Sequence, residues 1–155
     1  MLLSLSIRDF VLVERLELDC QPGFSVLTGE TGAGKSILLD ALSLLLGARA
    51  DAGVVRDGAD RAEIGAAFAT DQLPALEAWL AENGLEGDAG QCLVRRVIDA
   101  AGRSRAYLNG QPATLAQLKA AGEFLVDIHG QHAHYSLLKA DEQRRILDAY
   151  AGQTP

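Results

Sequence analysis

The stretch SVLTGETGAGKSILLDAL, residues 25–42, determines how the rest of the chain is interpreted. It begins with apolar residues, turns through three glycines, and continues with apolar residues at helical spacing, such as Ile37, Leu38 and Ala41. A strand, a glycine-rich turn and a helix in this order predict an anion site at the start of the helix.

Eight consecutive residues in this stretch fit G-x-x-x-x-G-K-[ST], the Walker A pattern of P-loop proteins. They are Gly29, Glu30, Thr31, Gly32, Ala33, Gly34, Lys35 and Ser36. The glycines let the backbone approach phosphates closely, and the N–H groups up to Ile37 point toward them. We expect Lys35 to reach the β- and γ-phosphates and the Ser36 hydroxyl to bind Mg²⁺. The sequence therefore predicts a nucleotide-binding site.

Composition limits the class of protein. The chain has 155 residues, 48% of them hydrophobic, which suits one globular domain. A net charge of −7 does not favour nucleic-acid binding through the overall electrostatic field. Two cysteines without a CxxC motif indicate reduced thiols. No apolar run long enough for a membrane span and no basic signal region are found, so we expect a cytoplasmic protein without membrane contact.

Alternating and helical patterns predict an α/β fold. The expected strands are 2–10, 12–20, 24–28, 62–70, two strands within 92–114, and a buried strand at 123–131. One helix is expected directly after the P-loop. Three more are expected at 73–84, 114–122 and 138–150, and Thr114 would be the N-cap of the helix at 114–122.

Three classes of P-loop protein compete. Small-molecule kinases usually open with the strand that feeds the P-loop, whereas two further strands precede it here. GTPases read guanine with N-K-x-D, but Asn83 and Asn109 are each followed by glycine. An ATPase head of the ABC type, in which a small antiparallel sheet flanks the P-loop, fits the pattern best.

Three segments carry a closer resemblance. They are LSIRDFVLVERLELDCQPGFSVLTGETGAGKSILLDALSLLLGARAD (5–51), GRSRAYLNGQPATLAQL (102–118) and LVDIHGQHAH (125–134). Together they resemble the start of the RecN family of bacterial DNA-repair proteins, an SMC-like branch of the ABC-type ATPases. The resemblance implies a P-loop core with an antiparallel β subdomain. Residues 1–150 would form the N-terminal lobe of the head, and 151–155 would begin the connection to a coiled coil.

The resemblance also implies a function. Such proteins are ATPases of double-strand-break repair and recombination, in which ATP with Mg²⁺ is held between two heads and its binding drives their dimerisation. The signature motif and the Walker B carboxylates would lie in a C-terminal half of the head, so this chain alone is expected to bind ATP without turnover. DNA would be bound by the full-length protein, at the nucleoid. The alternatives are a self-contained P-loop kinase and a non-catalytic, nucleotide-dependent dimerisation module.

The family pattern assigns further site residues. Gln131, just after an apolar strand, matches the Q-loop glutamine that senses Mg²⁺ and the γ-phosphate. Arg56 matches an arginine near the nucleotide, with Arg49 and Arg61 as rivals in the same loop, and a solvated loop charge is the alternative. Arg8 matches a position beside the adenine and ribose, where it would stack on the base. The alternative is that Phe10 belongs to the core and Arg8 to the surface.

Two groups of residues are left without a single role. His129, His132 and His134 crowd one loop, where a metal, a nucleotide contact and plain solvent exposure are alternatives. Four arginines fall on the predicted hairpin within 92–114, namely Arg95, Arg96, Arg103 and Arg105. Alternation places the first two on opposite faces, and the hairpin is interpreted either as facing DNA or as a salt-bridged edge.

Overall fold

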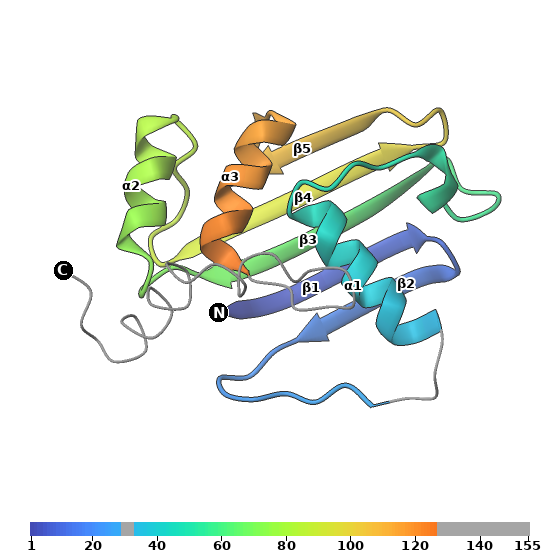
Figure 1. Cartoon of the computed structure of the whole chain (residues 1–155), viewed down its shortest axis with the longest axis horizontal. Helices are drawn as coiled ribbons and strands as arrows, with labels where there is room; N and C mark the ends of the chain where they lie inside the picture. Colours follow the sequence, from blue (N-terminus) through green and yellow to red (C-terminus); the bar gives the residue numbers. More distant parts are fainter. Residues whose placement is uncertain (29–32, 127–155) are drawn as a thin grey trace, which may run out of the picture.

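The computed structural model describes residues 1–28 and 33–126 of the chain, and Figure 1 shows their arrangement. The strands are β1 (Leu2–Phe10), β2 (Val13–Asp19), β3 (Arg61–Ala69), β4 (Gln91–Asp99), β5 (Ser104–Leu108) and β6 (Gln111–Ala113). The helices are α1 (Ala33–Leu45), α2 (Pro74–Glu82) and α3 (Leu115–Leu125), with a short 3-10 turn η1 (Ala52–Val54). The predicted α/β fold is confirmed.

The strands form one sheet in the order β2-β1-β3-β4-β5-β6, and every neighbouring pair is antiparallel. This is the antiparallel β subdomain expected from the sequence. Alternation along each strand separates two faces of the sheet. One face carries the buried side chains of β1, β3 and β4, including Ile7, Ile64, Phe68 and Val94.

Helices α1 and α3 lie across the apolar face of the sheet (Figure 1). Helix α1 contributes Ile37, Ala41, Leu44 and Leu45 to the core, at the spacing of one helical stripe. Helix α3 contributes Leu118 and Ala121, among others. The core therefore lies between the sheet and these helices and fixes the helix that follows the P-loop.

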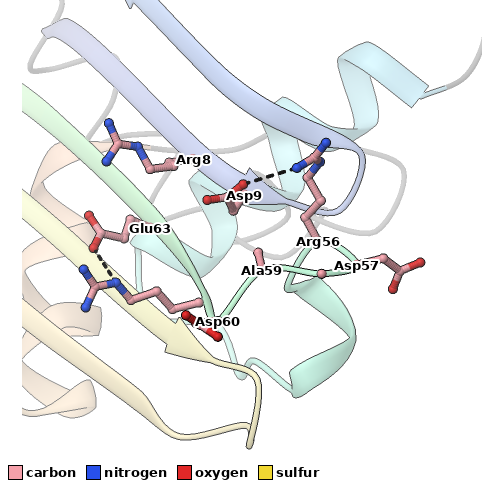
Figure 2. Close-up of a pocket in the computed structure, with 9 residues that line it drawn as sticks. Arg8, Asp9, Arg56, Asp57, Ala59, Asp60 and Glu63 are labelled. Atoms are coloured by element: carbon pink, nitrogen blue, oxygen red, sulfur yellow. Dashed lines mark ion pairs between the residues drawn. The ribbon is translucent and has the colours of Figure 1, made fainter.

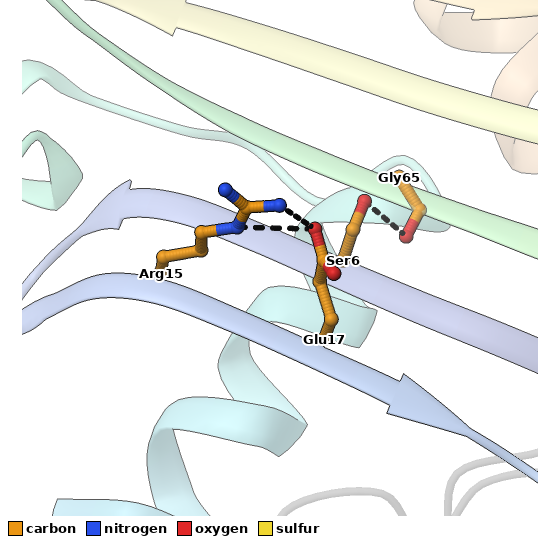
Figure 3. A network of polar contacts seen from close by, with 4 residues as sticks. All are labelled: Ser6, Arg15, Glu17 and Gly65. Carbon is orange, nitrogen blue, oxygen red and sulfur yellow. Dashed lines mark hydrogen bonds and ion pairs between the residues drawn. The ribbon is translucent and has the colours of Figure 1, made fainter.

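The opposite face of the sheet is polar. Figure 3 shows two contacts on it: Ser6 Oγ donates to the carbonyl oxygen of Gly65 at 3.4 Å, and Arg15 forms an ion pair with Glu17 at 2.6 Å. A side chain at Gly65 would bring a Cβ to 3.0 Å from Ser6 Oγ, so β1 and β3 approach closely here. Arg95 lies on this polar face, with its guanidinium carbon 5.2 Å from the centre of the Tyr107 ring.

The turns follow their sequence signals. Asn109 and Gly110 both have positive φ, at 50° and 79°, as expected for the tight turn between β5 and β6. Thr114 is the N-cap of α3, and a capping box with Gln117 confirms the predicted helix start. The loop between β4 and β5 is closed by an ion pair of 2.7 Å between Arg103 and Asp99.

Several predictions about elements were wrong. Residues 24–28 do not form a strand, because no neighbouring strand within the described residues offers them a hydrogen-bonded ladder. The strand expected from Glu123 does not begin there, since α3 continues to Leu125. Strand β5 is not a sheet edge, because β6 pairs with it. The predicted helix at 138–150 lies outside the described residues.

Within the described parts of the chain, no helix has the length and apolar content needed to cross a bilayer.

Candidate nucleotide-binding site

Helix α1 begins at Ala33, at the point where the glycine-rich motif predicts a helix. Gly34, Lys35 and Ser36 lie in its first turn and are exposed, whereas Ile37 is buried against the sheet. The first turn carries no acidic residue. The exposed turn therefore presents backbone N–H groups, an ammonium and a hydroxyl at the positive end of a 13-residue helix. The N–H groups and the ammonium suit a phosphate group, and the oxygen of the hydroxyl can bind a hard cation.

Several predicted site residues lie outside the part of the chain that the structure describes. Gly29, Glu30, Thr31 and Gly32 lie outside the described residues, as does Gln131. The three histidines, His129, His132 and His134, also lie outside them. Among the residues that the structure describes, no group of three or more His, Cys, Asp or Glu side chains is arranged to hold a metal ion. The candidate site is therefore built from the first turn of α1 and from the loops around it.

The turn between β1 and β2 has an unusual backbone. Asp9 and Val11 have φ angles of 49° and 53°, a left-handed conformation that is strained for a β-branched residue such as Val11. The loop after η1 pairs with this turn, because Arg56 N–H donates to the Asp9 carbonyl at 2.9 Å and Val11 N–H donates to the Val54 carbonyl at 2.8 Å. These bonds join two segments that are more than forty residues apart in sequence.

The backbone bond between Arg56 and Asp9 places Arg56 beside the β1–β2 turn. Its guanidinium forms ion pairs with Asp9 at 3.6 Å and with Glu14 at 3.7 Å. The Arg56 side chain is 39% exposed and that of Glu14 is 79% exposed, so these ion pairs are weak and leave the guanidinium in solvent. Of the three loop arginines proposed as rivals, Arg56 is the one tied to both ends of the β1–β2 turn.

A pocket of about 620 Å³ opens beside this turn, and Figure 2 shows Arg8, Asp9 and Arg56 around it. Its lining consists of Arg8, Asp9, Arg56, Asp57, Gly58, Ala59, Asp60, Arg61 and Glu63. The structure thus brings together three of the arginines considered from the sequence, while Arg49 is not part of the lining. The pocket is polar and carries both signs of charge.

The first turn of α1 does not contribute to this pocket. Arg8 alternates with Ile7, whose side chain is buried on the face that α1 covers, so Arg8 lies on the opposite, polar face of the sheet. Arg8 pairs with Glu63 across β1 and β3 in the strand register. The predicted contact of Arg8 with the base stays a prediction, and the geometry places its side chain apart from Lys35 and Ser36.

Both interpretations of the hairpin, facing DNA or a salt-bridged edge, are wrong for Arg96, which is buried and contacts α1. Arg96 lies on the core face of β4, between Val94 and Ile98, and is 1% exposed. Its guanidinium donates to the carbonyl oxygen of Leu44 in the last turn of α1 and to that of Ala48, three residues after the helix ends. The alternation of β4 contained a signal, because it placed a charged residue on an otherwise apolar face.

The family of the chain follows from its sequence and agrees with this geometry. The chain belongs to the AAA domain family, whose model matches residues 4–150. Within that class, it is similar to the DNA repair protein RecN of Vibrio cholerae, with 49% identity over 153 residues, 98% of this chain and 27% of that protein. The resemblance to the RecN family is confirmed, and the chain spans about a quarter of the length of this relative.

Solved structures show the same fold. The head domain of Smc with a coiled coil and joint, derived from Pyrococcus yayanosii, superimposes with a TM-score of 0.66 at 20% identity, covering 97% of this chain and 32% of that chain. A chain from work on ATP-driven dimerisation and DNA-stimulated activation of SMC ATPases gives a TM-score of 0.64 at 21% identity, covering 96% of this chain and 98% of that one. The fold is therefore that of an SMC-type ATPase head.

Proposed function

We propose that this chain is the ATP-binding portion of an SMC-like ATPase that acts in DNA double-strand-break repair and recombination. The observation that carries the proposal is the G-x-x-x-x-G-K-S motif, whose last four residues begin α1, with Lys35 and Ser36 exposed in its first turn. The similarity to a protein named for DNA repair supports the assignment of a process.

The residues of the motif would share the work of binding. The backbone N–H groups from Gly32 to Ile37 would surround the phosphates, and Lys35 would neutralise charge on the β- and γ-phosphates. The Ser36 hydroxyl would hold Mg²⁺, which supplies charge neutralisation between the phosphates when bound. Gln131, outside the described residues, remains the proposed sensor of Mg²⁺ and the γ-phosphate.

Arg56 is the proposed cation near the nucleotide. Its two ion pairs, with Asp9 and Glu14, hold it at the strained β1–β2 turn, where strain is typical of functional sites. The proposal uses Arg56 in preference to Arg49 and Arg61 for this reason.

Hydrolysis is proposed to need more than this chain. An apolar strand ending in Asp-Glu and a signature motif are both missing from the sequence. Residues 1–150 would be one lobe of a head, and 151–155 would begin the connection to a coiled coil that leads to the second half. The exposed apolar side chains of Phe24, Val26 and Leu27 support this, because a second half would supply strands that cover them.

The partners follow from the same reasoning. A second, identical head would close over the bound ATP, so that nucleotide binding drives dimerisation and hydrolysis reverses it. The full-length protein would bind DNA and act at the nucleoid in the cytoplasm.

The proposal is tested by ATP binding in the presence of Mg²⁺. Lys35→Ala removes the ammonium from the first turn of α1 and is expected to weaken ATP binding at least about tenfold, measured by titration calorimetry. Lys119→Ala is the matched control, because Lys119 lies exposed on α3 and this change should leave the affinity within about twofold of wild type. Equal affinities of wild type and Lys35→Ala would contradict the proposed site.

A further inference from the structure

The C-terminal end of α1 is held by a buried arginine. Arg96 is the largest fully buried side chain among the described residues, at 1% exposure. Its Nη1 donates to the carbonyl oxygens of Leu44 and Ala48, and its Nε donates to Ser104 Oγ at 2.9 Å. One side chain therefore joins the sheet to the end of the helix that begins at the P-loop.

The helix end compensates the buried charge. A buried guanidinium is costly unless its donors are satisfied, and within the described residues no carboxylate lies in ion-pair distance of Arg96. Leu44 lies in the last turn of α1, where the negative end of the helix dipole favours a cation, and its carbonyl accepts from Gly47 N–H at 3.2 Å as well as from Arg96. The Ala48 carbonyl, three residues after the helix, accepts the second bond from Arg96 Nη1. Burial lowers the pKa of Arg96, but a guanidinium remains protonated in proteins.

A second contact restrains the same end independently. Gly47 has a φ of 102°, and a Cβ placed on it would lie 2.9 Å from Lys119 Cα in α3. A Cβ on Gly122 would lie 3.1 Å from the carbonyl oxygen of Leu46. The backbone after α1 and the backbone of α3 are therefore in close contact, so the end of α1 is fixed from two sides.

Because an α-helix is rigid, restraining the C-terminal end of α1 also restrains the position of its N-terminal end. The rise of about 1.5 Å per residue puts the Lys35 turn about 14 Å along the axis from Leu44. Small rotations about the fixed end therefore become shifts of the phosphate-binding turn. We propose that Arg96 is a positioning residue for the nucleotide site, which acts by anchoring the end of α1 and so setting where Lys35 and Ser36 stand. This inference rests on the proposed function.

The test compares ATP affinity with thermal stability in the intact protein. Arg96→Met removes the charge and the hydrogen bonds while keeping a long side chain, and it is expected to weaken ATP binding about tenfold at a temperature where the variant is fully folded. Arg96→Lys keeps a cation that can satisfy some of the same carbonyls, so its affinity should lie between those of Arg96→Met and wild type. Affinity is measured by titration calorimetry and folding by circular dichroism.

Asn109→Ala is the matched control for lost stability. Asn109 also ties β4 to a loop, because its Oδ1 accepts from Leu93 N–H at 2.9 Å and its Nδ2 donates to the Leu85 carbonyl at 2.8 Å. Unlike Arg96, Asn109 makes none of its hydrogen bonds to α1. The Asn109→Ala variant should have a lower melting temperature, while the ATP affinity of the folded protein stays within about twofold of wild type.

The outcomes separate this inference from the proposed function. Wild-type affinity in Arg96→Met, or an equal loss of affinity in Asn109→Ala, would overturn the positioning role. If Arg96→Met does not fold, Arg96→Gln decides, because it also removes the charge, and wild-type affinity in that folded variant would overturn the positioning role. Wild-type affinity in Lys35→Ala would instead overturn the proposed function, and this inference with it.

Discussion

The two cysteines illustrate how burial controls chemistry at the scale of one residue. Cys92 is fully buried in β4, and burial raises the pKa of its thiol to about 11, whereas Cys20 is only half-buried. At pH 8 a thiol with that pKa is ionised in about one molecule in a thousand, and the thiolate is the reactive form. Cys92 is therefore structural.

Alkylation with iodoacetamide at pH 8, followed by mass spectrometry, checks this assignment. In the native protein we expect modification of Cys20 and protection of Cys92, and both residues should react once a denaturant unfolds the chain. A Cys20→Ser protein should therefore stay unmodified under native conditions. Modification of Cys92 in that native variant at the rate of a free thiol would show that β4 is not buried as described.

At the scale of the element, the capping box of α3 is the clearest link between sequence and structure. Thr114 Oγ1 accepts from Gln117 N–H at 3.1 Å, and Gln117 Oε1 accepts from Thr114 N–H at 2.9 Å. Thr114→Ala removes the first of these bonds and is expected to lower the free energy of unfolding by about 1 kcal/mol, measured by urea denaturation. Thr114→Ser keeps the hydroxyl and should stay close to wild type; equal losses in both variants would argue against the cap.

Most of the individual strands and helices could be predicted from the sequence. Strands β1 to β5 were predicted because alternation of apolar and polar residues reports a half-buried sheet directly. Residues 24–28 have the same apolar character, but a strand also needs a partner, which a local pattern does not reveal. The end of α3 was missed because the apolar run from Glu123 was interpreted as a strand, whereas α3 continues to Leu125. Gly122 lies inside this helix, against the backbone of Leu46.

Of the candidate site, the sequence predicted the P-loop turn but not the contacts of Arg96. The P-loop motif gave the first turn of α1, since eight consecutive residues carry the whole signal. Arg96 was not predictable as an anchor, because its partners are carbonyl groups of Leu44 and Ala48, about fifty residues away in sequence. A strand pattern reports which face a residue occupies, but not which backbone atoms lie across from it.

At the scale of the whole molecule, several large apolar side chains are exposed to solvent. Phe24 is 94% exposed and Val26 68%, and Leu39 on α1 is also exposed. Phe24 and Val26 lie in one segment, and large exposed apolar side chains that are neighbours in a chain are typical of an interface. The chain spans 27% of the length of the RecN relative from Vibrio cholerae, which supports our proposal that further parts of the head cover these side chains.

We propose that this chain holds an ATP site that is incomplete for hydrolysis. It is tested most directly by ATP turnover with Mg²⁺, measured for the chain alone with Lys35→Ala beside it. We predict no turnover above the Lys35→Ala control, and turnover that depends on Lys35 once the rest of the head is present. Turnover by the chain alone at about ten per second, lost in Lys35→Ala, is typical of a complete enzyme and would contradict the account.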